Sequence, residues 1–125
     1  MIIDTDVLIW YLRGNEKAVN AIIESLPFSI SIVTYMELLR GTKDKQEMRK
    51  MIKAFDAIGV NIIPIDEATS RLAAKYVEEH ALSNAIGLAD ALIAATAMTR
   101  GLPVFTANDK HYRVIDCLQM KIFRP

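Results

Sequence analysis

The amino-acid sequence predicts an α/β domain in which a mainly parallel sheet is covered by helices on both faces. Short β-prone runs alternate with segments of helical periodicity along the whole chain, which is the order typical of such folds. The 125 residues include 52% hydrophobic side chains, enough for one substantial core. No repeat, low-complexity tract or linker interrupts them. We therefore expect residues 1–125 to form a single domain.

The first quarter of the chain contains two expected strands and two expected helices. Residues 1–3 are apolar and β-prone, and residues 5–12 follow as a helix. Residues 16–26 carry apolar side chains near helical spacing until Pro27 ends the segment. Residues 28–32 alternate with period two, which indicates a strand.

The middle of the chain is expected to add three helices and one strand. Thr34 and Glu37 have the spacing of a capping box, which predicts a short helix beginning there. Residues 44–58 place their apolar side chains on one helical face, and residues 60–65 form the next β-prone run. Residues 67–81 show the pattern of an amphipathic helix.

The last third begins with a segment that is apolar nearly all round. Residues 88–99 are therefore expected to form a buried helix. A Gly-Leu-Pro turn leads into a strand at residues 104–106, and a final short strand is expected at residues 120–123.

Composition excludes several classes of protein. Fifteen basic and fifteen acidic side chains cancel, so no overall charge draws the chain to nucleic acid, and such binding would need local patches or metals. Cys117 is the only cysteine, which rules out an internal disulfide and a Cys-rich zinc site; we expect it to be semi-buried.

The longest apolar stretches also fall short of the ~20 residues needed to cross a membrane. Asp4 interrupts the apolar start before a secretion signal could form. We expect a cytoplasmic protein without membrane contact.

Acidic residues follow two of the expected strands. Asp4 and Asp6 lie in an apolar run with no Lys or Arg before Arg13. Burying such a carboxylate costs several kcal/mol, roughly, unless a metal, a hydrogen-bond network or a cation compensates it. Asn108 and Asp109 come after the strand at residues 104–106 in the same way. In an open parallel sheet these positions meet at one edge.

Two further acids have a structural as well as a functional interpretation. Asp90 is the only charged residue in the expected buried helix, where an acid in the first turn would interact favourably with the helix dipole. Glu37 is explained by the capping box, although a helix packed on the sheet could also direct it at the strand ends. Both interpretations stay open at this point.

Four oxygen-rich positions from separate segments suit a hard divalent cation such as Mg²⁺ or Mn²⁺. Zinc is disfavoured because His80 and His111 lie far apart in the sequence. Such a site fits metal-assisted hydrolysis of a phosphodiester, in which the metal lowers the pKa of water and offsets negative charge.

Four segments of the chain together resemble the motifs of PIN-domain ribonucleases. The segments are residues 3–9, 35–41, 88–95 and 106–112, in the family's order and near its spacing. Within that family the chain is most similar to the VapC-type toxins of prokaryotic toxin–antitoxin pairs. The resemblance implies a three-layer α/β/α sandwich, Mg²⁺- or Mn²⁺-dependent endoribonuclease activity, a homodimer, and inhibition by a cognate antitoxin.

The resemblance also implies the site. Asp4, Glu37 and Asp90 match the family's metal-binding acids, and Asn108 falls on its fourth catalytic position, which is Asp in some members and Asn in others. Asp6 stands where the family more often has Asn or Ser. Asp6 and Asp109, which is adjacent to Asn108, are therefore additional candidates.

Basic residues near these motifs are candidates for RNA binding. Arg13 follows the first motif, and others lie on or before the expected helix at residues 44–58, where a solvated helix surface explains them equally well. The candidates are Arg13, Arg40, Lys43, Lys45, Arg49 and Lys53. Lys110 and Arg113 flank the last motif and are further candidates.

Two rival functions compete with the nuclease. Asp4 and Asp6 also fit a haloacid-dehalogenase-type phosphatase, with Asp4 as nucleophile and Asp6 as general acid. That fold needs a second late acid, which residues 88–92 lack. The other rival is a catalytically inactive PIN-like module that binds RNA or a protein partner.

Overall fold

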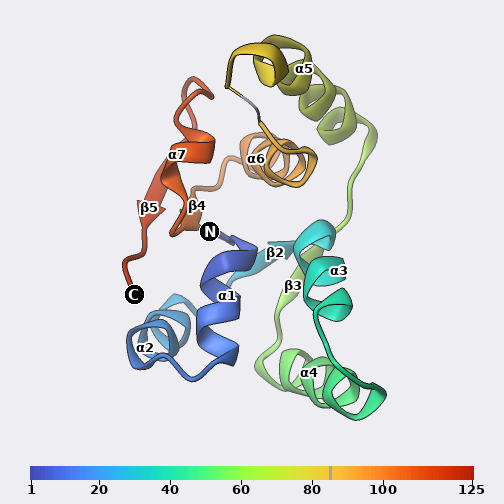
Figure 1. Ribbon diagram of the computed structural model, residues 1–125, viewed down its shortest axis with the longest axis vertical. Helices are drawn as coiled ribbons and strands as arrows, with labels where there is room; N and C mark the ends of the chain where they lie inside the picture. The colour runs from blue at the N-terminus through green and yellow to red at the C-terminus, as the bar shows by residue number, and fades with distance from the viewer. Residues whose placement is uncertain (85) are drawn as a thin grey trace.

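Five short strands form one sheet in the computed structural model, which describes residues 1–84 and 86–125 (Figure 1). All neighbouring strands are parallel, and their order across the sheet is β3-β2-β1-β4-β5. The strands are β1 (Ile2–Ile3), β2 (Ser29–Ser31), β3 (Asn61–Ile63), β4 (Val104–Thr106) and β5 (Met120–Ile122).

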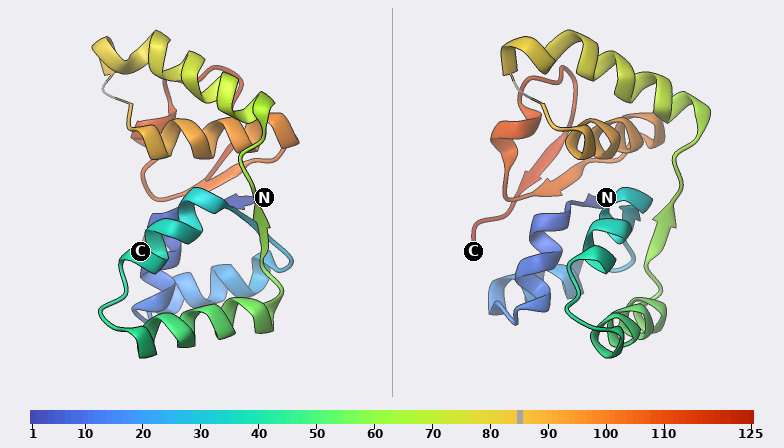
Figure 2. Two further views of the ribbon diagram at one scale, coloured as in Figure 1. Left: turned by 90° about the vertical axis from the view of Figure 1, so that its right-hand side faces the viewer. Right: turned by 45° about the vertical axis from the view of Figure 1, so that its right-hand side comes forward.

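Helices cover both faces of this sheet, so that the molecule has three layers (Figure 2). One layer holds α5 and α6, and the other holds α1, α2 and α4, while α3 contacts both α1 and α6. The helices are α1 (Thr5–Leu12), α2 (Glu16–Ser25), α3 (Ile32–Arg40), α4 (Lys45–Ile58), α5 (Glu67–Asn84), α6 (Leu88–Arg100) and α7 (Asp109–Tyr112).

The sheet divides the hydrophobic core into two clusters. Ile2 pairs with Val104 across β1 and β4, and both belong to the cluster under α5 and α6. Ile3 pairs with Phe105, and both belong to the cluster under α1, α2 and α4. Successive side chains on a strand point to opposite faces, so two central residues of β1 are enough to anchor both layers.

The strand order makes the ends of β1 and β4 the expected place for a functional site. The chain moves from β1 outward to β2 and β3, then returns to β4 on the other side of β1. At such a reversal the loops after the two strands diverge and leave room for a ligand at the carboxyl ends of the strands. Asp4 and Asp6 follow β1, and Asn108 follows β4.

The predicted fold class, a three-layer α/β sandwich with a parallel sheet, is confirmed. The predicted start of α3 is wrong, because the helix begins at Ile32 and is capped by Ser31, whose hydroxyl accepts a 3.1 Å hydrogen bond from the Val33 N–H. Thr34 and Glu37 therefore lie inside the helix and do not form a capping box.

Two smaller expectations also differ from the structure. The chain forms a short helix, α7, directly after β4, which no sequence pattern predicts. Cys117 is exposed and not semi-buried. Over the part of the chain that the structure describes, no helix is both long and apolar enough to span a membrane.

Candidate active site

Asp4 connects β1 to α1 and is held from both sides. It is the N-cap of α1, and its Oδ1 accepts a 2.8 Å hydrogen bond from the Thr5 N–H. Its Oδ2 accepts a 2.8 Å hydrogen bond from the hydroxyl of Thr106, at the end of β4. Only 5% of the residue is exposed. The carboxylate is therefore fixed at the junction of the two central strands.

Burial, and to a smaller extent the nearby charge of Asp6, raise the pKa of Asp4 to about 6. The hydrogen bonds from Thr106 and from the Thr5 N–H favour the ionised form and offset part of this effect. Among the described residues, no Lys or Arg forms an ion pair with Asp4 or Asp6. Their negative charge is left without a cationic partner.

Asp6 links the first turn of α1 to the loop after β4. Its Oδ1 accepts a 2.7 Å hydrogen bond from the Val7 N–H, and its Oδ2 accepts a 3.1 Å hydrogen bond from the Ala107 N–H. Burial raises the pKa of Asp6, and the charge of Asp90 adds a smaller contribution. Asp6 therefore lies close enough to Asp4 and to Asp90 for electrostatic repulsion between the carboxylates.

Asp90 lies in the first turn of α6, as the sequence predicts. Its side chain is 23% exposed, and its Oδ2 lies 3.3 Å from Nδ1 of His111 on α7. Gly87, the N-cap of α6, is also close: a Cβ added there would lie 3.2 Å from Asp90 Oδ2. The same carboxylate oxygen thus lies near both the start of its own helix and an imidazole.

Glu37 reaches the same region through Thr5, the residue that follows Asp4. The Thr5 hydroxyl donates a 2.7 Å hydrogen bond to Glu37 Oε1. The Thr5 oxygen also lies 3.1 Å from the hydroxyl oxygen of Thr34, which is fully buried on α3. Glu37 itself is exposed, so its carboxylate is accessible from solvent while one oxygen is held.

Asn108 and Asp109 have separate environments although they are adjacent. The Asn108 N–H donates a 2.9 Å hydrogen bond to the Thr106 hydroxyl, and its side chain is exposed. Asp109 is 2% exposed and accepts hydrogen bonds from Arg113 and Arg124. The hydrogen bond from Arg124 is the main cause that lowers the pKa of Asp109. Both carboxylate oxygens of Asp109 are therefore occupied by ion pairs with two arginines.

The hydroxyl of Tyr112 is a further polar group beside the acids. Tyr112 is fully buried, and among the described residues its hydroxyl is the buried side-chain polar atom that lacks a hydrogen-bond partner. Burial, and then the charges of Asp4 and Asp90, raise its pKa. Sequence reasoning missed the Tyr112 hydroxyl and the contacts that Thr5, Thr106 and His111 make with the acids.

Comparison with known proteins identifies the family. The sequence matches the PIN domain family over residues 1–116. The chain belongs to the PIN domain family. Ribonuclease VapC10 from Mycobacterium tuberculosis is 32% identical over 95% of this chain and 90% of that protein. The resemblance to this family drawn from the four motifs is confirmed.

Solved structures share the PIN fold. A toxin-antitoxin complex from Klebsiella pneumoniae contains a chain that superposes with a TM-score of 0.78, at 28% identity over 92% of each chain. VapBC2 from Rickettsia felis, bound to a DNA fragment from its promoter, superposes with a TM-score of 0.82 at 18% identity, over 98% of each chain.

The donor set of this PIN domain fits a hard divalent cation. Its side chains offer only oxygen ligands, and the buried charge of Asp4 has no basic partner among the described residues. In residues 1–84 and 86–125, however, no three His, Cys, Asp or Glu side chains lie close enough together to hold an ion. The candidate acids lie at one edge of the sheet, but their carboxylates are too far apart in this structure to coordinate one ion together.

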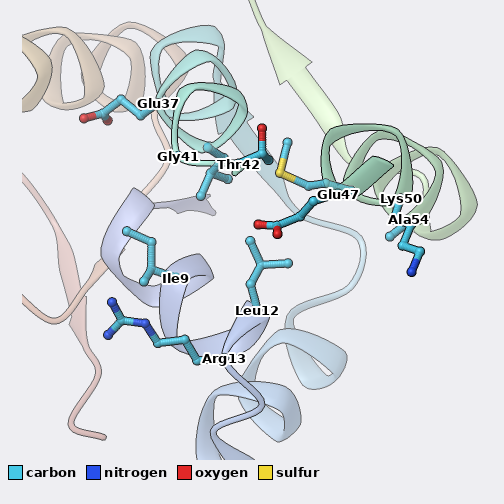
Figure 3. Close-up of a pocket in the computed structure, with 11 residues that line it drawn as sticks. Ile9, Leu12, Arg13, Glu37, Gly41, Thr42, Glu47, Lys50 and Ala54 are labelled. Atoms are coloured by element: carbon cyan, nitrogen blue, oxygen red, sulfur yellow. The ribbon is translucent and has the colours of Figure 1, made fainter. Parts of the chain in front are cut away.

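A groove between α1, α3 and α4 adjoins this site (Figure 3). It encloses about 630 Å³ and combines exposed apolar side chains, such as Ile9 and Leu12, with charged ones from α3, from α4 and from the residue that follows α1. Glu37 lies at its rim, with the carboxylate directed away from Glu47 in this view. Arg13, a candidate for RNA binding, also lines the groove.

Most of the other basic candidates for RNA binding lie on or near α4, whereas Lys110 lies on α7 and Arg113 follows it. Arg40 ends α3, and Lys43 pairs with Glu47 at 3.9 Å. Figures 1 and 2 place α4 at the end of the molecule away from α6, which carries Asp90. The exposed stripe on α4 consists of Lys45, Arg49 and Lys53. A role for this stripe stays a prediction, and it would concern RNA remote from Asp90.

Proposed function

We propose that this protein is an endoribonuclease that hydrolyses RNA phosphodiester bonds and acts as the toxin of a type II toxin–antitoxin pair. The observation that carries the proposal is the buried, ionisable Asp4, next to Asp6 and without a cationic partner among the described residues. The family and the relative named ribonuclease VapC10 support it. Residues 1–125 would form one nuclease domain.

Asp4, Glu37 and Asp90 would hold a divalent ion, with Asn108 as the fourth member of the catalytic set and Asp6 as an additional candidate. When bound, Mg²⁺ or Mn²⁺ supplies Lewis acidity, which lowers the pKa of water and offsets charge on the phosphate. Asp109 is an unfavourable candidate, because its oxygens are taken by two arginines.

The residues around these acids would position them. The Thr106 hydroxyl and the Thr5 N–H fix the two oxygens of Asp4 and favour its ionised form, which is the form that can bind a cation. The Thr5 hydroxyl orients Glu37, and His111 orients Asp90. Each candidate acid thus has a neighbour that limits the directions its carboxylate can take.

The same charges make RNA binding depend on the cation. Asp4 and Asp6 repel one another strongly enough to raise the pKa of Asp4, and an RNA phosphate would meet the same repulsion. We therefore expect the affinity of RNA at this site to rise when the divalent ion is present.

The partners would be RNA as substrate and a cognate antitoxin as inhibitor. Neighbours of this fold include a toxin-antitoxin complex from Klebsiella pneumoniae, which supports the antitoxin. A homodimer and a cytoplasmic location are part of the proposal, and light scattering of the purified chain would test the oligomeric state.

The deciding experiment is cleavage of RNA by the purified protein. Cleavage should require Mg²⁺ or Mn²⁺, stop on chelation, and be lost in Asp4→Asn and Asp90→Asn. Asp56→Asn, an exposed acid on α4, is the matched control and should cleave normally. RNA binding without cleavage in any metal would favour the inactive module, and phosphate release from small phosphomonoesters would favour the phosphatase.

A further inference from the structure

A second, polar pocket lies directly beside the acids. It encloses about 370 Å³. Its lining residues are Ala107, Asn108, Asp109, Lys110, His111 and Arg124. Three of them also belong to the candidate active site or contact it: Asn108 is the fourth member of the candidate catalytic set, the Ala107 N–H donates to Asp6 at 3.1 Å, and His111 Nδ1 lies 3.3 Å from Asp90 Oδ2. The pocket and the acids therefore share a wall.

The charge of this pocket is opposite to that of the acids. Lys110 and Arg124 are positive, and the one acid in the lining, Asp109, is compensated by Arg113 as well as by Arg124. Lys110 is exposed and pairs with no acid among the described residues. A positive hollow next to a strongly negative site attracts an anion that extends past the acids.

Arg124 is fixed in place and still accessible. Its Nη1 donates to the Ala107 carbonyl at 3.0 Å, and its Nη2 donates to Asp109 Oδ1 at 2.8 Å. Its side chain is nevertheless 60% exposed. A guanidinium held by a carbonyl and a carboxylate keeps further N–H donors for a ligand and loses little entropy when it binds one.

We propose that this pocket binds a phosphate of the RNA strand adjacent to the phosphate that is cleaved. The inference rests on the proposed ribonuclease function and specifies how its substrate is positioned. Arginine and lysine donors match a phosphodiester in charge and hydrogen-bonding geometry. Anchoring the neighbouring phosphate would hold the strand over the acids, which by themselves repel it.

Arg113 and Arg124 provide a matched pair of variants. Both donate to Asp109, and the side chain of each is 60% exposed. Only Arg124 lines the pocket, and the structure places Arg113, which the sequence made a candidate for RNA binding, outside the pocket lining. Arg113→Gln and Arg124→Gln therefore each remove one ion pair with Asp109, but only Arg124→Gln removes positive charge from the pocket. Lys110→Gln removes pocket charge and leaves the ion pairs of Asp109 with Arg113 and Arg124 intact.

The first measurement is the affinity of RNA at several salt concentrations in EDTA. The readout is the fluorescence anisotropy of a labelled single-stranded RNA. For Arg124→Gln and Lys110→Gln, each lost phosphate contact should reduce the slope of log affinity against log salt by about 0.7. Arg113→Gln should retain the wild-type slope. Equal slopes in all four proteins, or an equal loss in Arg113→Gln, would overturn the proposal.

The second measurement identifies the phosphate. RNA substrates each carry one neutral methylphosphonate next to the scissile bond, and cleavage is followed in Mg²⁺. A methylphosphonate at one position should slow cleavage by the wild type about tenfold or more, which is the effect of losing a charge-assisted hydrogen bond. The same methylphosphonate should not slow cleavage by Arg124→Gln further, because that variant already lacks the contact. Equal penalties in both proteins at every position would exclude the pocket.

The two measurements separate the two proposals. If the wild-type protein cleaves no RNA in any divalent metal, the proposed function fails, while the binding slopes in EDTA still decide whether the pocket holds a phosphate. If Arg124→Gln fails to fold, as judged by circular dichroism, Lys110→Gln takes its place in both measurements, because that exposed side chain has no ion pair to lose in the described part of the chain.

Discussion

The Thr106 hydroxyl donates a 2.8 Å hydrogen bond to Oδ2 of Asp4 across 102 positions of sequence. The same hydroxyl accepts a 2.9 Å hydrogen bond from the Asn108 N–H. Both residues of the pair are buried. One threonine thus joins the acid that follows β1 to the loop that follows β4, and it sets the relative positions of two parts of the candidate site.

Thr106→Val should destabilise the protein through Asp4. The substitution keeps the volume of the side chain but leaves a buried carboxylate oxygen without its donor. The cost should be about 2 kcal/mol in the free energy of unfolding at pH 8, from urea denaturation, because hydrogen bonds to charged groups are worth about 1.5–3 kcal/mol. Thr106→Ser retains the hydroxyl and should lose much less. An equal cost in both variants would attribute the loss to packing.

Asp4→Asn should stabilise the protein at neutral pH while it abolishes cleavage. The native pKa of Asp4 is about 6 against an ordinary value of 3.8, so the folded protein binds this proton more tightly than the unfolded chain. The stability that Asp4 contributes is therefore complete below pH 3.8, decreases as the pH rises to about 6, and is constant above that. Two pKa units correspond to about 3 kcal/mol.

The measurement is the difference in unfolding free energy between Asp4→Asn and wild type, in EDTA, at several pH values from 4 to 8. Taking this difference cancels the contributions that other titrating groups make to the pH dependence of stability. Asp109 is one of them, and its lowered pKa makes the protein more stable as the pH rises. The stability advantage of Asp4→Asn over the wild type should be largest at pH 8 and should decrease toward pH 4. A difference that does not change with pH would show that burial of Asp4 carries no electrostatic cost.

Divalent metal should reverse this cost in the wild type. Mg²⁺ or Mn²⁺ should raise the melting temperature of the wild-type protein at pH 8, with a stabilisation of about 2.7 kcal/mol at a concentration 100 times the dissociation constant. The effect should weaken at pH 5, because Asp4 is then protonated and a cation must displace the proton. Asp4→Asn should show little shift. An equal shift in both proteins would place the metal elsewhere.

Much of the fold could be predicted from local patterns. The alternation of β-prone and helical segments gives the parallel sheet, because each pattern is set by nearby residues. The start of α3 is different: residues 28–32 alternate like a strand, but the Ser31 hydroxyl caps a helix there, and β-branched Ile32 and Val33 are helical. Packing of α3 against α1 and α6 outweighs their weak helix propensity.

The candidate site could be predicted only in part, because its contacts are long-range. Asp4 and Asp90 are recognisable as acids in apolar surroundings, and both the fold and the family support their grouping; their catalytic roles stay predictions. The environment of Asp109 depends on Arg124, which lies 15 positions later beyond β5. No periodicity in the sequence indicates that contact, so the sequence could not separate Asp109 from Asn108.

Gly87→Ala should impair cleavage without unfolding the protein. Gly87 has φ −76° and ψ 155°, which alanine adopts readily, so the fold should be retained. The new Cβ would lie 3.2 Å from Asp90 Oδ2, and because His111 Nδ1 lies 3.3 Å from the same atom, the carboxylate has little room to move. Gly41→Ala is the matched control, since its Cβ would meet only backbone oxygens at 3.5 and 3.6 Å. The rate of RNA cleavage should fall in Gly87→Ala alone, with similar melting temperatures, and equal rates in the two variants would show that the position of Asp90 does not limit the reaction.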